Sequence, residues 1–201
     1  MSKYQICVSG AAAGDTVESS HMLAYALGVA IAEQGHTLLT GATSGLPQYA
    51  ARGAKDQGGL SVGFSPAGSI REHVKSYRLP VKEFDYINFT NMDYVGRDTY
   101  LVRSSDAVIT VGGRSGSLHE FSTAIESHKI CGILLGSGGV ADFIPTLLDK
   151  IQIHAKKDDI IFDTDPARLI KTIIARLDKE YADFKDEIKS LEDRPKKSLR
   201  G

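Results

Sequence analysis

One stretch of nine residues combines the residue types that bind phosphate with one that does acid–base chemistry. Residues 112–120 read Gly-Gly-Arg-Ser-Gly-Ser-Leu-His-Glu and follow an apolar run at residues 107–111. Glycines let the backbone approach an anion, and the first amides of a helix, with the positive end of its dipole, favour negative charge. We predict a strand, a phosphate-binding turn and a helix, with the Glu120 carboxylate close to a bound phosphate ester. The predicted phosphate contacts are Gly112, Gly113, Arg114, Ser115, Gly116 and Ser117.

Two more glycine-containing turns follow predicted strands, at residues 9–14 (Ser-Gly-Ala-Ala-Ala-Gly) and 41–47 (Gly-Ala-Thr-Ser-Gly-Leu-Pro). The first does not match G-x-G-x-x-G, and no acidic residue follows the second strand, so a Rossmann-type NAD site is disfavoured. A tight turn without a ligand explains the first turn equally well. The helix N-termini near Gly45 and Ser117 could converge on one anion. Further predicted nucleotide contacts are Gly10, Gly41, Thr43, Ser44 and Gly45.

A third candidate group is an arginine in the predicted helix that precedes the phosphate-binding turn. Arg97 lies near the start of this helix, on the ligand side of the sheet, and a guanidinium there suits a bidentate grip on phosphate. The alternative is a surface ion pair. Arg103 is six residues further on and does not share the same helical face, so we expect it to be structural.

The elements that must position these groups alternate between strands and helices. The strands are continuous apolar runs, which is typical of a parallel sheet covered on both faces. We therefore predict an α/β fold, a doubly wound and mostly parallel sheet with helices on both faces, in a Rossmann-like three-layer sandwich. Predicted strands cover residues 3–9, 36–40, 60–64, 83–89, 106–111, 129–135 and 159–162, and predicted helices cover 17–34, 45–57, 93–104, 117–127, 139–151 and 166–177.

Length and composition favour one domain, at residues 1–180, followed by a charged and flexible tail at residues 181–201. The net charge of −1 argues against a nucleic-acid-binding protein. No apolar run approaches the length of a membrane span and no signal sequence is visible, so we expect a cytoplasmic protein. Cys7 and Cys131 each lie in a predicted buried strand and lack zinc-site spacing. We expect free thiols, no metal and no cofactor.

The motifs resemble those of the LONELY GUY family, also labelled "possible lysine decarboxylase". Its pattern P-G-G-x-G-T-x-x-E aligns with residues 112–120 on Glu120, its M-H-x-R-K motif aligns with residues 94–98 on Arg97, and its G-G-x-x-G-L-M aligns with residues 41–47. The similarity extends over residues 4–150. Three departures are Gly112 for proline, Arg114 for glycine and Ser117 for threonine. With Tyr-Val-Gly-Arg-Asp at residues 94–98, they bring the chain closer to the branch that includes molybdenum-cofactor carrier proteins.

The resemblance implies a nucleotide-binding protein that hydrolyses the N-glycosidic bond of a nucleoside 5′-monophosphate to free base and ribose 5-phosphate. Residues 113–117 would hold the phosphate, Glu120 would stabilise charge on the ribose and activate water, and Arg97 would orient the phosphate or polarise the base. Asp98 is a weaker candidate for a second carboxylate, and His119 is expected to be structural or to lie at the rim.

Two other interpretations stay open at this point. The first is a non-catalytic protein that binds or carries a nucleotide or the molybdenum cofactor. The second, DNA processing, is disfavoured by the near-neutral charge. Relatives imply a homodimer or higher homo-oligomer, for which the apolar helical segments at residues 22–31 and 123–125 are candidate interfaces.

Overall fold

The computed structural model describes residues 4–153 and 155–182, together with residues 184 and 187. Within these residues the predicted alternation of strands and helices is present. The strands are β1 (Gln5–Gly10), β2 (Thr37–Thr40), β3 (Ser61–Ser65), β4 (Tyr86–Phe89), β5 (Ala107–Val111), β6 (Ile130–Leu134) and β7 (Ile160–Asp163). The α-helices are α1 (Asp15–Glu33), α2 (Leu46–Asp56), α3 (Ile70–Lys75), α4 (Asp93–Arg103), α5 (Ser115–Glu126), α6 (Gly139–Leu148) and α7 (Pro166–Glu180).

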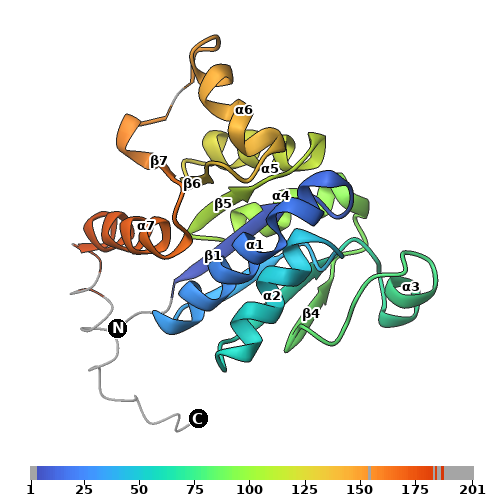
Figure 1. The fold of residues 1–201 in the computed structure, drawn as a ribbon. Coiled ribbons are helices and arrows are strands. Elements are labelled where there is room, and N and C mark those ends of the chain that lie inside the picture. Colours follow the sequence, from blue (N-terminus) through green and yellow to red (C-terminus); the bar gives the residue numbers. More distant parts are fainter. Residues whose placement is uncertain (1–3, 154, 183, 185–186, 188–201) are drawn as a thin grey trace, which may run out of the picture.

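The strands form one sheet in the order β4-β3-β2-β1-β5-β6-β7, and every neighbouring pair is parallel. The chain runs outward from β1 to β4, crosses back to β5, and then continues in the opposite direction (Figure 1). The order therefore reverses between β1 and β5. In open α/β sheets, the crevice outside the carboxyl ends of such strands is where ligands bind.

The sheet is the middle of three layers, as predicted. Successive strand residues point to opposite faces. On one face, Ile6 and Ile109 belong to a core cluster that includes residues of α1, α2 and α7. On the other face, Cys7 and Val108 pack with residues of α4, α5 and α6. Both cysteines are buried and free, which confirms the expectation for them.

Helix α3 is the main element that the sequence patterns missed. It has only six residues, too few to show helical periodicity. Its start nevertheless carries two capping hydrogen bonds: the side chain of the N-cap residue Ser69 accepts one from the Glu72 amide, and the Glu72 carboxylate accepts one from the amide of Gly68, the residue before the N-cap. The spacing Ser-x-x-Glu is a known signal for a helix N-terminus.

The apolar segments predicted as an interface turn out to be mostly core. In α1, Leu27 and Ile31 are fully buried within the chain, and in α5 Ala124 and Ile125 are buried as well, whereas Met22 is 63% exposed. The sequence could not separate the two roles, because an apolar stripe looks the same whether it faces the sheet or a second subunit. Most of the predicted tail at residues 181–201 lies outside the described residues. In the part that the structure describes, no helix has the length and apolar character needed to cross a membrane.

Candidate functional site

A cavity of about 320 Å³ lies at the carboxyl ends of β1 and β5, where the strand order reverses. Its size is at the lower end of the roughly 300–1,000 Å³ typical of ligand pockets. It is lined by residues 8–12 from β1 and its turn, by residues of the turn after β2, by Tyr94, Arg97 and Asp98 of α4, and by residues 114–117 and Glu120 of α5. The structure therefore brings Glu120 and Arg97 together with most of the predicted phosphate-binding stretch.

The turn before α5 places the start of this helix at the cavity. Gly112 and Gly113 have φ values of 54° and 97°, a region that side chains disfavour. Their carbonyls accept hydrogen bonds from the first amides of α6, those of Ala141 and Val140. These two glycines therefore shape the turn and do not line the cavity.

Arg114 is the N-cap residue of α5, and its side chain makes no capping hydrogen bond. The amides of residues 115–117, in the first turn, have no acceptor among the described residues. Unpaired amides at a helix N-terminus attract anions. Residues 114–117 all line the cavity, so an anion in it would meet these amides.

The Glu120 carboxyl group lies at the inner wall of the cavity. The residue is only 7% exposed, and its Oε2 accepts a short hydrogen bond from the Ser9 hydroxyl. Burial, and after it the negative charge of Asp98, raise the pKa of Glu120, whereas Arg97 and the Ser9 hydrogen bond lower it, and the net result is a pKa of about 7. A carboxyl group with such a pKa can both take and give a proton at neutral pH.

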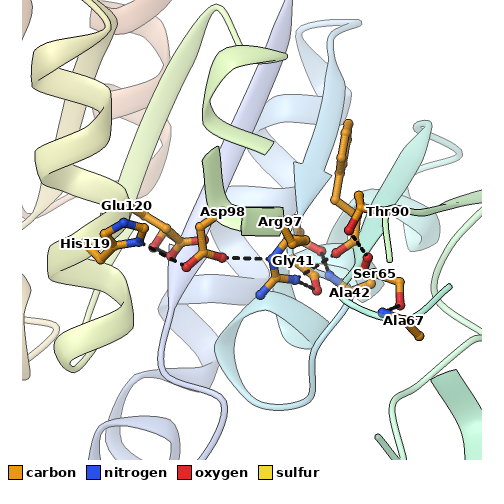
Figure 2. A network of polar contacts seen from close by, with 12 residues as sticks. Gly41, Ala42, Ser65, Ala67, Thr90, Arg97, Asp98, His119 and Glu120 are labelled. Carbon is orange, nitrogen blue, oxygen red and sulfur yellow. Dashed lines mark hydrogen bonds and ion pairs between the residues drawn. The ribbon is translucent and has the colours of Figure 1, made fainter. Parts of the chain in front are cut away.

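Arg97 is buried rather than part of a surface ion pair, with 4% of its surface exposed. Its Nε donates to Asp98 Oδ1 (2.8 Å), and its Nη1 donates to the carbonyls of Phe64 (2.8 Å) and Gly41. Figure 2 shows the guanidinium between Asp98 and Gly41. Of its three nitrogens, only Nη2 has no partner in the described part of the chain. The predicted bidentate grip on phosphate does not fit this geometry, because two of the three nitrogens are already committed.

The turn after β2, which was predicted to contact the nucleotide, also packs against the turn after β1. The first two residues of α2 offer no free amide to the cavity, because the Leu46 amide donates to the Ala11 carbonyl (2.9 Å) and Pro47, which lines the cavity, has no amide hydrogen. Ser44 Oγ likewise donates to the Ala12 carbonyl (3.2 Å). At Gly45 an added Cβ would lie 2.4 Å from the Ala11 carbonyl oxygen, so glycine is needed for this close approach.

The other predicted contacts of these turns lie closer to the cavity. Gly10, Gly41 and Thr43 all line it. An added Cβ at Gly41 would lie 2.5 Å from Arg97 Nη1, so this glycine makes room for the guanidinium. The ligand-binding role of these residues stays a prediction.

Sequence reasoning gave little weight to three residues that the structure places at the site. Asp98 is 6% exposed and lies 3.4 Å from Nδ1 of His119, whose side chain is 40% exposed and does not line the cavity. The centroid of the Tyr94 ring lies 5.6 Å from Cζ of the Arg97 guanidinium. Ser9 contacts Glu120 although the two are 111 positions apart. Only the adjacency of β1 and β5 in the sheet could have indicated the last contact.

Comparisons with known proteins agree with this architecture. An uncharacterized protein of Archaeoglobus fulgidus is 36% identical over 129 residues, which cover 64% of this chain and 78% of that protein. The molybdenum cofactor binding protein of Rippkaea orientalis superposes with a TM-score of 0.67 and 28% identity, over 87% of this chain and 99% of that one. The molybdenum cofactor carrier protein of Chlamydomonas reinhardtii gives a TM-score of 0.67 and 26% identity, over 87% and 98%. A family model matches residues 3–170, and the chain belongs to the SLOG cluster4 family.

Proposed function

We propose that the protein binds a nucleoside 5′-monophosphate and hydrolyses its N-glycosidic bond to a free base and ribose 5-phosphate. One observation carries this proposal: a buried carboxyl group, Glu120, shares a cavity with the unpaired amides of the α5 N-terminus. An anion-binding turn alone supports binding only. A carboxyl group with a pKa of about 7 beside that turn supports proton transfer as well.

In this proposal the 5′-phosphate lies at the amides of residues 115–117, with Arg114 as an additional cation. The ribose then lies toward Glu120, which is about one helical turn further along α5. Water adds to C1′ while the bond from C1′ to the base nitrogen breaks, and the electron pair of that bond stays on the base. The ionised Glu120 stabilises positive charge on the ribose and takes the proton from the attacking water. That proton then passes to the departing base nitrogen, which leaves Glu120 ionised again.

Arg97 serves the leaving base in this arrangement rather than the phosphate. Its Nη2 is the nitrogen left for a ligand, and a charged donor near the base favours the departure of an anionic or weakly basic leaving group. The guanidinium is fixed by Asp98 and by two backbone carbonyls, so it needs little reorganisation when a ligand binds.

A second candidate function is non-catalytic binding or transport of a nucleotide or of the molybdenum cofactor. Two observations favour it. Solved structures named as binding or carrying that cofactor match almost the whole fold. Arg114, where the LONELY GUY pattern has glycine, adds a cation at the cavity wall. The cargo in this case is an anionic ligand that is held and not turned over.

The experiment incubates the protein with AMP, GMP, CMP and UMP and measures free base by liquid chromatography. Release of base that Glu120→Gln abolishes, while Glu126→Gln on the exposed end of α5 does not, supports the hydrolase. If no base appears but a nucleotide or the molybdenum cofactor raises the melting temperature, the hydrolase proposal is wrong and the carrier function stands. If Glu120→Gln weakens binding as much as turnover, Glu120 is structural.

A further inference from the structure

We propose that Ser9 is a positioning residue for the proposed reaction: its hydroxyl fixes the Glu120 carboxylate in place and favours its ionised form. This inference rests on the proposed function for its consequence but on the contact itself for its evidence. Ser9 is 1% exposed, lies next to the end of β1, and donates from Oγ to Glu120 Oε2. Both residues line the same cavity.

Ser9 is the only hydrogen-bond donor to the Glu120 side chain among the described residues. The groups that face this carboxyl are Asp98 and Arg97 from α4 and Cys7 from β1. His119, which lies on α5 like Glu120, is 3.4 Å from Asp98. Figure 2 shows Glu120, Asp98 and His119 grouped at one end of the polar network. Asp98 repels a negative charge on Glu120, and burial denies it water. Arg97 and Ser9 therefore have to supply the stabilisation that an ionised Glu120 needs.

The contribution of Ser9 differs from that of Arg97 in being directional. Arg97 acts on Glu120 through its charge and directs Nε and Nη1 to other partners. A hydroxyl that donates to one carboxylate oxygen restricts the rotation of the carboxylate. This donated hydrogen bond is lost if that oxygen is protonated and must itself act as the donor. A proton acceptor held this way keeps one orientation toward the ribose.

The neighbouring strand offers a matched control for this contact. Thr110 of β5 lies directly opposite Ser9 in the register of β1 and β5, so its side chain lies on the same face of the sheet. It is fully buried, and its hydroxyl has no hydrogen-bond partner in the described part of the chain. Thr110→Val removes a buried hydroxyl from the same region with almost no change of volume.

The test is a pH titration of the Glu120 side-chain carboxyl by ¹³C NMR in the full-length protein, with the signal assigned by its loss in Glu120→Gln. Ser9→Ala should raise the titration midpoint by about one pH unit, because losing a hydrogen bond destabilises the ionised carboxylate by roughly the free energy of one pKa unit. Ser9→Cys, with a weaker donor of similar shape, should give a smaller rise, and Thr110→Val should give none. Near-native circular dichroism of each variant confirms that it folds.

Two results overturn the inference: a midpoint that Ser9→Ala leaves unchanged or lowers, and an equal rise in Thr110→Val. If Ser9→Ala does not fold, the midpoint of Ser9→Cys decides alone, and an unchanged value there refutes the proposal. If the wild type releases base, the acidic limb of its pH–rate profile should shift to higher pH in Ser9→Ala, by as much as the NMR midpoint does. An acidic limb at unchanged pH counts against the positioning role. If no base is released, the proposed function fails while the titration still decides the role of Ser9.

Discussion

The buried carboxyl group of Glu120 should make the protein less stable as pH rises, and Glu120→Gln should remove that loss. Folding raises the pKa of this group from 4.5 to about 7, first because of burial and then because of the charge on Asp98. Below pH 4.5 both folded and unfolded chains carry the proton, so the residue costs nothing. Between these two values the unfolded chain releases the proton while the folded chain keeps it, and the free energy of unfolding falls. Above pH 7 the loss is complete.

The size of the effect follows from the two pKa values. They differ by about 2.5, and each pKa unit corresponds to about 1.36 kcal/mol, so the loss reaches roughly 3 kcal/mol at most. Glutamine has nearly the same shape, carries no charge, and its side-chain carbonyl can still accept the hydrogen bond from Ser9. We therefore expect Glu120→Gln to raise the free energy of unfolding by about 1–3 kcal/mol at pH 8 and to leave it nearly unchanged at pH 4.5.

The assay is urea unfolding followed by circular dichroism at pH 4.5, 6, 7 and 8. The difference between the variant and the wild type is the useful quantity, because other titrating groups cancel in it. Glu126→Gln, at an exposed position of the same helix, controls for the loss of one negative charge from α5. A difference that does not grow with pH, or a Glu120→Gln variant that is the less stable protein at pH 8, refutes the reasoning.

Three other substitutions test separate parts of the site. Asp98→Asn removes the charge that repels Glu120, so the ¹³C NMR midpoint of Glu120 should fall, opposite to the effect of Ser9→Ala; a rise contradicts this. Gly41→Ala places a Cβ 2.5 Å from Arg97 Nη1 and should cost about 1–3 kcal/mol in urea unfolding, whereas at Gly116 an added Cβ meets nothing within 4 Å and should cost little. Arg114→Gly should weaken nucleoside monophosphate binding about tenfold by calorimetry, and an equal loss for the unphosphorylated nucleoside would show that the cation does not act on phosphate.

The fold could be predicted from the sequence because its signals are local. A strand that is covered on both faces is a continuous apolar run, and β5 and β6 are buried along their whole length. Glycine after a helix, as at Gly35, marks its end. Helix α3 was missed because six residues show no period, although the capping pair Ser69 and Glu72 was visible in the sequence.

The candidate site could be predicted only as a set of residues. The positions of Glu120 and Arg97 near the carboxyl ends of the strands follow from helix starts and from the alternation of elements. Their surroundings depend on contacts between distant segments: Arg97 contacts Gly41 across 56 positions and Phe64 across 33. Those contacts are set by the strand order, which a single sequence does not display.

The surroundings change what each group can do in the proposed reaction. Because Nε and Nη1 already donate to Asp98 and to backbone carbonyls, Arg97 cannot bind a phosphate with two nitrogens. In the proposed reaction the phosphate is therefore bound by the α5 amides and Arg114. Arg97 is then left to the base side of the cavity, and its charge also favours the ionised Glu120. The sequence analysis placed the phosphate contacts and Glu120 in one motif and Arg97 in another. In the structure one buried network of Ser9, Arg97, Asp98 and Glu120 links them, and its charge balance decides whether Glu120 carries a proton when a ligand arrives.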